Sequence, residues 1–162
     1  MTAFRVGQGW DNHRIIPGRP LMVGGVRIDC DFGFEGHSDA DILLHALTDA
    51  VLGAAGQGDI GQHFPDSDPR WKGASSDQFL RQAVSLARNA GYVLVNADAT
   101  VVLERPKLKD YRERIRASVA SILGVDHSAV NVKFKTSEKV GPVGEGRSGE
   151  AQAIVLLAQT AP

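Results

Sequence analysis

One helix constrains the fold of this 162-residue chain more than any other feature of its sequence. Between residues 38 and 55, apolar side chains recur at intervals of three and four positions, which predicts an amphipathic α-helix. Ser38 and Asp41 have the spacing of a capping box at its start, and the glycine-rich stretch GAAGQGDIG marks its end. We therefore expect a helix from Ser38 to Ala55.

Shorter patterns predict the remaining elements. Runs of apolar and β-branched residues indicate strands, and two further periodic segments, each stopped near a glycine, indicate helices. The expected strands are Phe4–Gly9, Leu21–Ile28, Ala97–Leu103, Val130–Thr136 and Glu150–Gln159, and the other expected helices are Ser76–Ala90, with a capping-box pattern at Ser75 and Gln78, and Asp110–Leu123. This order predicts an α+β sandwich in one domain, residues 1–162, with helices on one face of a mainly four-stranded mixed sheet.

Charge is divided unevenly along the chain. Residues 1–68 carry four cations and ten anions, whereas residues 69–162 carry fourteen cations and nine anions. Four of the five histidines also lie in the first part. Candidate metal ligands therefore gather in the first part, and candidate phosphate-binding groups gather after it.

Composition excludes several classes of protein. With 43% hydrophobic and 23% charged residues the chain is not intrinsically disordered, and its apolar runs are far shorter than the roughly 20 residues that span a membrane. The N-terminus MTAFRVGQGW lacks a signal-peptide core, so we expect a cytoplasmic protein. The single cysteine, Cys30, is expected to be a structural thiol, and the absence of a long basic run argues against a nucleic-acid partner.

A candidate metal centre begins just after the first expected strand. Asp11 and His13 are two positions apart, so their side chains lie on the same side of an extended chain. His45, on the first helix, is the best third ligand, and one carboxylate with two imidazoles suits zinc or another first-row divalent ion. Asp41 and Asp49 lie one turn before and after His45. Either carboxylate can orient the imidazole, or Asp41 can simply complement the helix dipole.

Other polar groups surround the start of that helix. His37, Ser38 and Asp39 precede it, where backbone N–H groups favour a phosphate. Ser38 can serve the cap, the ligand or both, and His37 is either a donor to a charged oxygen or a solvated loop residue. The following loop, residues 58–69, carries three carboxylates beside apolar groups, which suits recognition of hydroxyl groups on a polyol or ribose.

Two basic segments lie in the second part of the chain. Arg105–Lys109 follows a strand and suits the binding of a base and a phosphate. Further on, Lys133 and Lys135 share one strand face, while Thr136 and Glu138 share the other. A hydroxyl and a carboxylate beside these cations suit a Mg²⁺-bridged diphosphate. Basic clusters are also commonly solvated surfaces, and the residues alone leave that alternative open.

In this order the motifs resemble those of the 2-C-methyl-D-erythritol 2,4-cyclodiphosphate synthases of the non-mevalonate isoprenoid pathway. The resemblance covers almost the whole chain and rests on Gly9–His13, Gly36–Gly73, Arg105–Leu108 and Lys135–Gly141. It implies a homotrimer with sites between subunits. It also implies a phosphorus–oxygen lyase that converts 4-diphosphocytidyl-2-C-methyl-D-erythritol 2-phosphate to the cyclic diphosphate and CMP. The substrate's own 2-phosphate attacks the β-phosphorus, so no protein nucleophile is required.

The resemblance also implies roles for individual residues. Asp11, His13 and His45 are the expected zinc ligands, Glu138 the expected ligand of Mg²⁺ or Mn²⁺, and His37 and Thr136 the expected catalytic groups that stabilise the pentacoordinate phosphorus. The expected substrate contacts are Asp11, Asn12, His13, His37, Ser38, Asp59, Ile60, Gly61, Phe64, Pro65, Asp66, Ser67, Asp68, Leu103, Glu104, Arg105, Pro106, Lys107, Leu108, Lys109, Lys135, Thr136, Ser137, Glu138, Pro142 and Glu145.

A few positions depart from the pattern of the family. Lys135 stands where many members have threonine, Pro142 replaces an aromatic residue, and Glu145 and Arg147 exchange the places of arginine and glutamate. In the family that last segment lines a cavity on the trimer axis. Two other functions remain open from the residues alone: a metal-dependent phosphohydrolase, and a zinc-stabilised trimer that binds cytidine nucleotides without catalysis.

Overall fold

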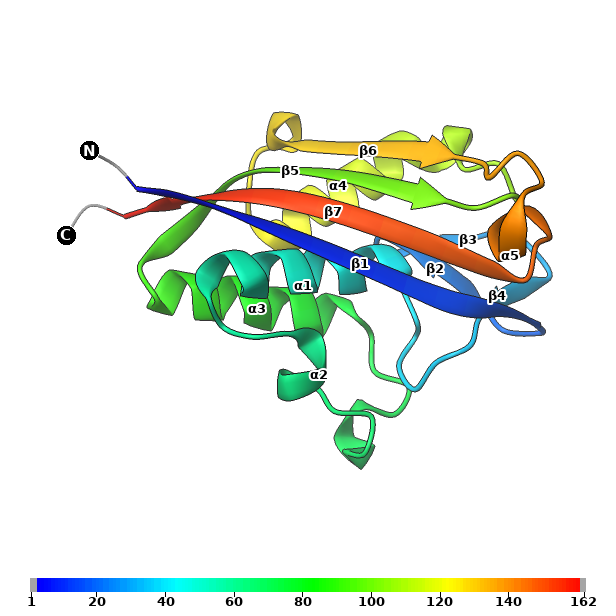
Figure 1. The fold of residues 1–162 in the computed structure, drawn as a ribbon, viewed down its shortest axis with the longest axis horizontal. Helices are drawn as coiled ribbons and strands as arrows, with labels where there is room; N and C mark the ends of the chain where they lie inside the picture. The colour runs from blue at the N-terminus through cyan, green and yellow to red at the C-terminus, as the bar shows by residue number, and fades with distance from the viewer. Residues whose placement is uncertain (1–2, 161–162) are drawn as a thin grey trace.

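A mixed sheet of five strands organises the chain in the computed structural model, which describes residues 3–160 (Figure 1). The expected domain span, 1–162, therefore includes four terminal residues outside the described range. In sheet order the strands are β4 (Phe32–Phe34), β1 (Phe4–Pro17), β7 (Ser148–Gln159), β5 (Tyr92–Val102) and β6 (Val130–Lys135). Only β5 and β6 pair in parallel. The expectation of four strands is wrong because β4, only three residues long, joins the edge of β1.

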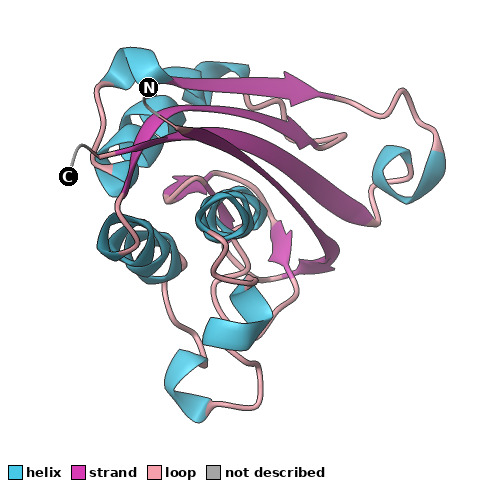
Figure 2. Ribbon diagram, turned by 60° about the vertical axis from the view of Figure 1, so that its left-hand side comes forward, coloured by secondary structure: helices cyan, strands magenta, loops and turns pink. Residues whose placement is uncertain are grey.

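Three helices, α1 (Ile42–Ala55), α3 (Asp77–Asn89) and α4 (Arg112–Leu123), pack on one face of this sheet. The shorter segments lie between the longer elements; they are the helices α2 (Ile60–His63) and α5 (Gly141–Gly144) and the 3₁₀ turns η1 (Pro69–Trp71), η2 (Lys109–Tyr111) and η3 (His127–Ala129). Figure 2 shows α1 and α3 side by side under the curved sheet. Small and β-branched strand residues such as Ala99, Val132 and Val155 are buried beneath the helices and form the core. Among residues 3–160, no helix has the length and apolar character needed to cross a membrane.

The first helix begins later than its sequence pattern predicts. Asp41 caps α1, since its carboxylate accepts a hydrogen bond of 3.1 Å from the Leu44 N–H, whereas Ser38 lies outside the helix. The same carboxylate also accepts 2.9 and 2.7 Å bonds from the backbone of Gly24 and Gly25. Asp41 is completely buried and ties this distant turn to the helix. This contact with a distant turn, which local capping rules do not consider, sets where α1 starts.

Several other boundaries differ from expectation. The first strand continues past Gly9 to Pro17, so Asp11 and His13 lie within β1. The expected strand Leu21–Ile28 is a hairpin of β2 (Leu21–Val23) and β3 (Val26–Ile28), a separate small sheet that turns at two glycines with positive φ. The expected capping box before α3 does not form, because the Ser75 hydroxyl donates to the Asp77 carboxylate and the helix starts at Asp77.

The central helix lies directly against the backbone of β1. A Cβ atom added at Gly7 would be 1.9 Å from the carbonyl oxygen of Ala50, and one at Gly9 would be 1.9 Å from that of Ala46. Glycine is required at both positions because any side chain would push the helix away from the strand. This close approach holds α1, including His45, at a fixed distance from β1.

The opposite face of the sheet carries exposed apolar side chains. Phe4, Val6 and Trp10 alternate along β1, and Ile154 lies opposite Gln8 on the paired strand β7, so the four share one face. Each is between 51% and 70% exposed. Clustered exposed apolar groups of this kind mark interaction surfaces. We call this set the open-face patch.

The glycine contact predicts a position-specific loss of stability. Gly7→Ala is expected to destabilise the protein by about 1–3 kcal/mol, the usual cost of overpacking a tight interior. Gly53→Ala is the matched control, because a Cβ there meets nothing within 4 Å and alanine favours a helix. Urea unfolding monitored by circular dichroism measures both variants. Equal midpoints for Gly7→Ala and the wild type would contradict the argument.

Candidate metal centre and its cavity

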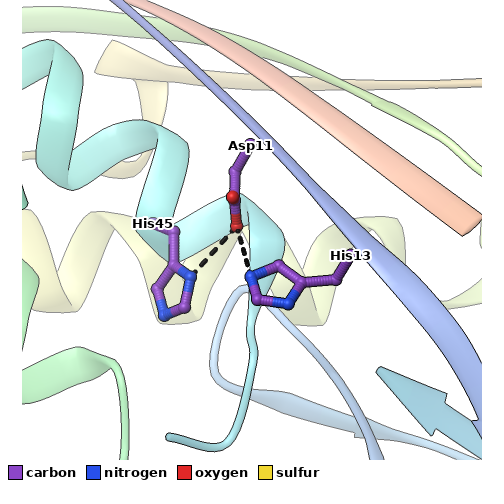
Figure 3. Close-up of side chains that lie close together, drawn as sticks. All are labelled: Asp11, His13 and His45. Carbon is purple, nitrogen blue, oxygen red and sulfur yellow. Dashed lines mark hydrogen bonds and ion pairs between the residues drawn. The ribbon is translucent and has the colours of Figure 1, made fainter. Parts of the chain in front are cut away.

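Three side chains from β1 and α1 converge on one point (Figure 3). The Asp11 Oδ2 atom lies 3.1 Å from His13 Nε2 and 3.0 Å from His45 Nδ1. The three donor atoms all lie within 4.8 Å of one another, and each residue is partly buried. The structure therefore brings together the three residues that the sequence pattern singled out as candidate metal ligands.

Their electrostatics reflect this closeness. Burial alone would raise the pKa of Asp11, but hydrogen bonds from His13 and His45, together with their positive charge, lower that pKa to about 2. For His13, burial lowers the pKa, and the hydrogen bond and charge of Asp11 outweigh it, so the pKa is raised. Asp11 is thus an ionised carboxylate at neutral pH and favours a cation between the three groups.

The donor chemistry of the cluster fits a divalent metal ion. His13 Nδ1 donates a hydrogen bond to the carbonyl oxygen of Glu35, which only accepts, so Nδ1 carries a proton. A metal ion that displaced the proton shared by Nε2 and Asp11 would therefore meet a lone pair on Nε2. A lone pair from imidazole beside an ionised carboxylate is the ligand set that zinc and similar ions bind. The third ligand, His45, completes a site with three protein donors.

The cluster opens into a cavity of about 500 Å³. Many expected contacts line it, and three lining residues were not expected. The expected ones are Asp11, Asn12, His13, His37, Ser38, His45, Ile60, Gly61, Phe64, Pro65 and Asp66, and the others are Gly36, Trp71 and Phe79. Asp59, Ser67 and Asp68 are not among the lining residues. Asp59 caps α2, and Asp68 caps η1 while pairing with Arg70.

An aromatic wall closes one side of this cavity. The rings of Phe64 and Phe79 lie 4.6 Å apart, Trp71 meets both edge-on, and the His45 ring lies 6.0 Å from Phe79. Sequence reasoning missed Trp71 and Phe79, since neither belongs to a polar motif. Trp71 does lie within the Gly36–Gly73 segment that carried the family resemblance, whereas Phe79 lies outside it. The wall shields the cluster from water, which strengthens its electrostatic interactions.

The carboxylates expected to orient His45 have other partners. Asp41 holds the hairpin turn and the start of α1. Asp49 accepts a 2.7 Å hydrogen bond from the Ile60 N–H and so holds the loop that lines the cavity. Burial, together with nearby Asp59 and Asp11, raises the pKa of Asp49. Neither carboxylate hydrogen-bonds His45, and of the two alternatives for Asp41 the structure supports its role at the start of the helix.

A second cavity, of about 340 Å³, lies beyond the ends of β5 and β6. Seven expected contacts line it, with Val101, Arg112 and Phe134 in addition: Leu103, Pro106, Lys107, Leu108, Lys109, Lys135 and Thr136. Among the described residues, the linings of the two cavities have none in common. His37 and Thr136, both expected at the reacting phosphorus, thus lie in different cavities of one chain.

The remaining expected contacts lie around these cavities. The Thr136 hydroxyl donates to Glu138 over 2.6 Å, and the Ser137 N–H donates to Glu104, which ties together the segments after β5 and β6. The Arg105 guanidinium lies over the Phe32 ring. Pro142 lines a third cavity, of about 580 Å³, and Glu145 forms an ion pair of 2.7 Å with Arg147.

Comparisons with known proteins agree on one family. The profile of the YgbB family matches residues 4–158. A 2-C-methyl-D-erythritol 2,4-cyclodiphosphate synthase from Solibacter usitatus (strain Ellin6076) is 63% identical over 157 residues, which cover 97% of this chain and 99% of the relative. A solved synthase structure of that name superposes with a TM-score of 0.88 and 44% identity, covering 94% of this chain and 99% of the other. A CDP-bound form superposes with a TM-score of 0.88 and 42% identity over the same shares.

The chain therefore belongs to the YgbB family. Within that family it is a cyclodiphosphate synthase, a lyase of isoprenoid biosynthesis that forms a cyclic diphosphate and releases CMP. This outcome confirms the resemblance in the sequence. The comparisons give no support to the phosphohydrolase or to the non-catalytic nucleotide-binding module.

Metal binding is expected to depend on the Asp11–His13–His45 cluster and not on the number of histidines in the chain. Wild-type protein should retain about one Zn²⁺ per chain after dialysis, and His13→Ala should bind it at least about tenfold more weakly, since even outer-shell losses cost that much. His127→Ala is the control, because His127 lies on η3 and pairs with Glu113. Elemental analysis and chelator competition measure both. Equal retention by the two variants would contradict this metal site.

Proposed function

We propose that the chain converts 4-diphosphocytidyl-2-C-methyl-D-erythritol 2-phosphate into 2-C-methyl-D-erythritol 2,4-cyclodiphosphate and CMP, as a homotrimer with its sites between subunits. The observation that carries the proposal is the Asp11–His13–His45 cluster at the wall of a 500 Å³ cavity, in a chain of this family. Residues 1–162 act as one synthase domain. The partners are the small cytidine diphosphate substrate and two further copies of the chain. We place this enzyme in the cytoplasm, away from membranes and nucleic acids.

Two kinds of metal ion serve this reaction in our proposal. Asp11, His13 and His45 would hold Zn²⁺ or another first-row divalent ion, and Glu138 would hold Mg²⁺ or Mn²⁺ beside the substrate's diphosphate. Bound there, the ions would supply Lewis-acid neutralisation of the phosphate oxygens. The ionised state of Asp11 supports the first assignment. The 2.6 Å hydrogen bond from Thr136 to Glu138 supports the second, since it places the hydroxyl and the carboxylate side by side.

The residues of the first cavity position the nucleophile. The substrate's 2-phosphate is already ionised at neutral pH, so its oxygen attacks the β-phosphorus without a protein base. A new P–O bond forms, the bond to the CMP phosphate breaks, and CMP leaves with that electron pair. His37 and Ser38, at the cavity wall, orient the phosphate, and Asp66 with Ile60 and Gly61 contacts the methylerythritol portion. Water is excluded by the aromatic wall.

Residues of the second cavity bind the cytidine portion and stabilise the negative charge that develops on the phosphorus oxygens. Lys107, Lys109 and Lys135 supply cations, and Leu103, Pro106 and Leu108 supply apolar contacts for the base. When substrate binds, the Thr136 hydroxyl turns from Glu138 and donates a hydrogen bond to a phosphorus oxygen as charge develops there. The remaining contacts in this segment are Glu104, Arg105 and Ser137, and Pro142 with Glu145 flanks it.

A trimer would unite the two cavities. The cavity beside the cluster and the second cavity share no lining residue among those described, which supports a site completed by the second cavity of a neighbouring subunit. The open-face patch supplies apolar surface for such contacts. The acidic first part of one subunit would then meet the basic second part of the next, which favours assembly electrostatically.

Turnover of the named substrate tests the proposed reaction. Purified protein with Zn²⁺ and Mg²⁺ is expected to release CMP and a cyclic diphosphate, which phosphorus NMR distinguishes from linear phosphates. Asp11→Asn should abolish the reaction while sedimentation still reports a trimer, because Asp11 lies at the site and not in the core. Linear phosphate products, or a monomeric Asp11→Asn protein, would count against the proposal.

Mixing two inactive variants tests whether each site spans two subunits. Thr136→Val should reduce kcat by about 10²–10³, the cost of removing one donor to a developing oxyanion. Mixed trimers of Asp11→Asn and Thr136→Val chains should recover activity, because about a quarter of sites then combine the intact half of each chain. Each variant mixed with itself is the control. Verified mixed trimers without recovered activity would place both groups in one subunit's site.

A further inference from the structure

The imidazole of His45 has a hydroxyl partner that neither its metal role nor its sequence neighbours explain. Its Nε2 atom lies 2.9 Å from the hydroxyl oxygen of Ser76, 31 residues away, and 3.2 Å from that of Ser38. Ser76 is completely buried and immediately precedes α3. Serine at that position ordinarily caps the helix, yet the Ser76 side chain makes no capping hydrogen bond. Its hydroxyl oxygen lies beside His45 instead.

A carboxylate determines the direction of that hydrogen bond. Asp39 accepts the hydroxyl proton of Ser76 on Oδ1 and the backbone N–H of Ser76 on Oδ2, the latter over 3.1 Å. An ionised carboxylate only accepts, and a serine hydroxyl has a single proton to donate. The Ser76 oxygen therefore has only lone pairs left for His45, so the proton between them belongs to His45 Nε2.

The position of this proton decides what His45 presents to the metal. With Nε2 protonated, a metal ion that displaces the proton shared by Nδ1 and Asp11 Oδ2, atoms 3.0 Å apart, would meet the ring's lone pair on Nδ1. The other tautomer would direct an N–H into the metal position and could not bind. Asp39 is itself fixed, since it also accepts a 3.2 Å bond from the Asp41 N–H.

We propose that Ser76 and Asp39 are positioning residues that hold His45 in its metal-binding tautomer through the relay Asp39–Ser76–His45. The inference rests on the metal assignment of the proposed function. It adds two residues outside the cluster that set metal affinity. Outer hydrogen-bond partners of metal-binding histidines typically contribute 10–100-fold to affinity.

Zinc affinity and the tautomer itself test the relay. By chelator competition, Ser76→Ala and Asp39→Asn should each bind Zn²⁺ about 10–100-fold more weakly than wild type. Ser76→Thr keeps a hydroxyl and should restore affinity to within about threefold. Ser75→Ala is the matched control: that neighbouring hydroxyl is exposed, bonds only to Asp77 and should leave affinity unchanged.

Nitrogen-15 NMR of histidine-labelled protein, with and without zinc, reads the Nε2 proton of His45 directly. In both forms that proton should exchange with water more slowly in the wild type than in Ser76→Ala, because the Ser76 oxygen accepts it. Circular dichroism identifies folded variants, and Asp39→Asn serves if Ser76→Ala does not fold. Wild-type affinity in both variants, or an Nε2 atom that carries no proton in the wild type, would overturn the relay. If wild-type protein bound no zinc, the metal assignment would fail, and the Nε2 proton would still decide whether the relay exists.

Discussion

The contact between α1 and β1 is the constraint on which the rest of the molecule depends. Gly7 and Gly9 leave no side chain between strand and helix, so the two backbones meet directly. His45 precedes Ala46, whose carbonyl would collide with any side chain at Gly9. The strand then carries Asp11 just beyond the contact. The metal cluster is therefore a consequence of backbone packing, and its geometry is as rigid as the core beneath it.

Electrostatics connect the two cavities of the fold. The acidic part of the chain supplies the carboxylate and imidazoles of the cluster, and burial beside an aromatic wall strengthens their coupling. The basic part supplies ammonium groups around the other cavity. In the proposed reaction, cations held by the cluster and the ammonium groups of the second cavity would together balance the three phosphates of the substrate. The near-zero net charge of the chain is thus the sum of an acidic first part and a basic second part.

Local sequence patterns predicted the features that depend on near neighbours, and they missed those that depend on contacts between distant parts of the chain. Apolar spacing predicted α1, and a period of two along β1 predicted that Asp11 and His13 share a side. The start of α1 was misplaced because the Asp41 carboxylate also accepts hydrogen bonds from a hairpin turn that is distant in sequence. The same limitation hid Ser76, whose partners lie 31 and 37 positions away. The three-residue β4 was missed because its pairing, and not its composition, makes it a strand.

The parallel pair β5 and β6 has a consequence for how this enzyme can diversify. Parallel strands end at the same edge of a sheet, so the segments that leave them, residues 103–109 and 136–141, meet there and enclose the second cavity. The Asp11–His13–His45 cluster rests on antiparallel β1 and the helix across it. The two cavities thus belong to separate parts of one sheet, and the residues that line one can change while the other keeps its shape.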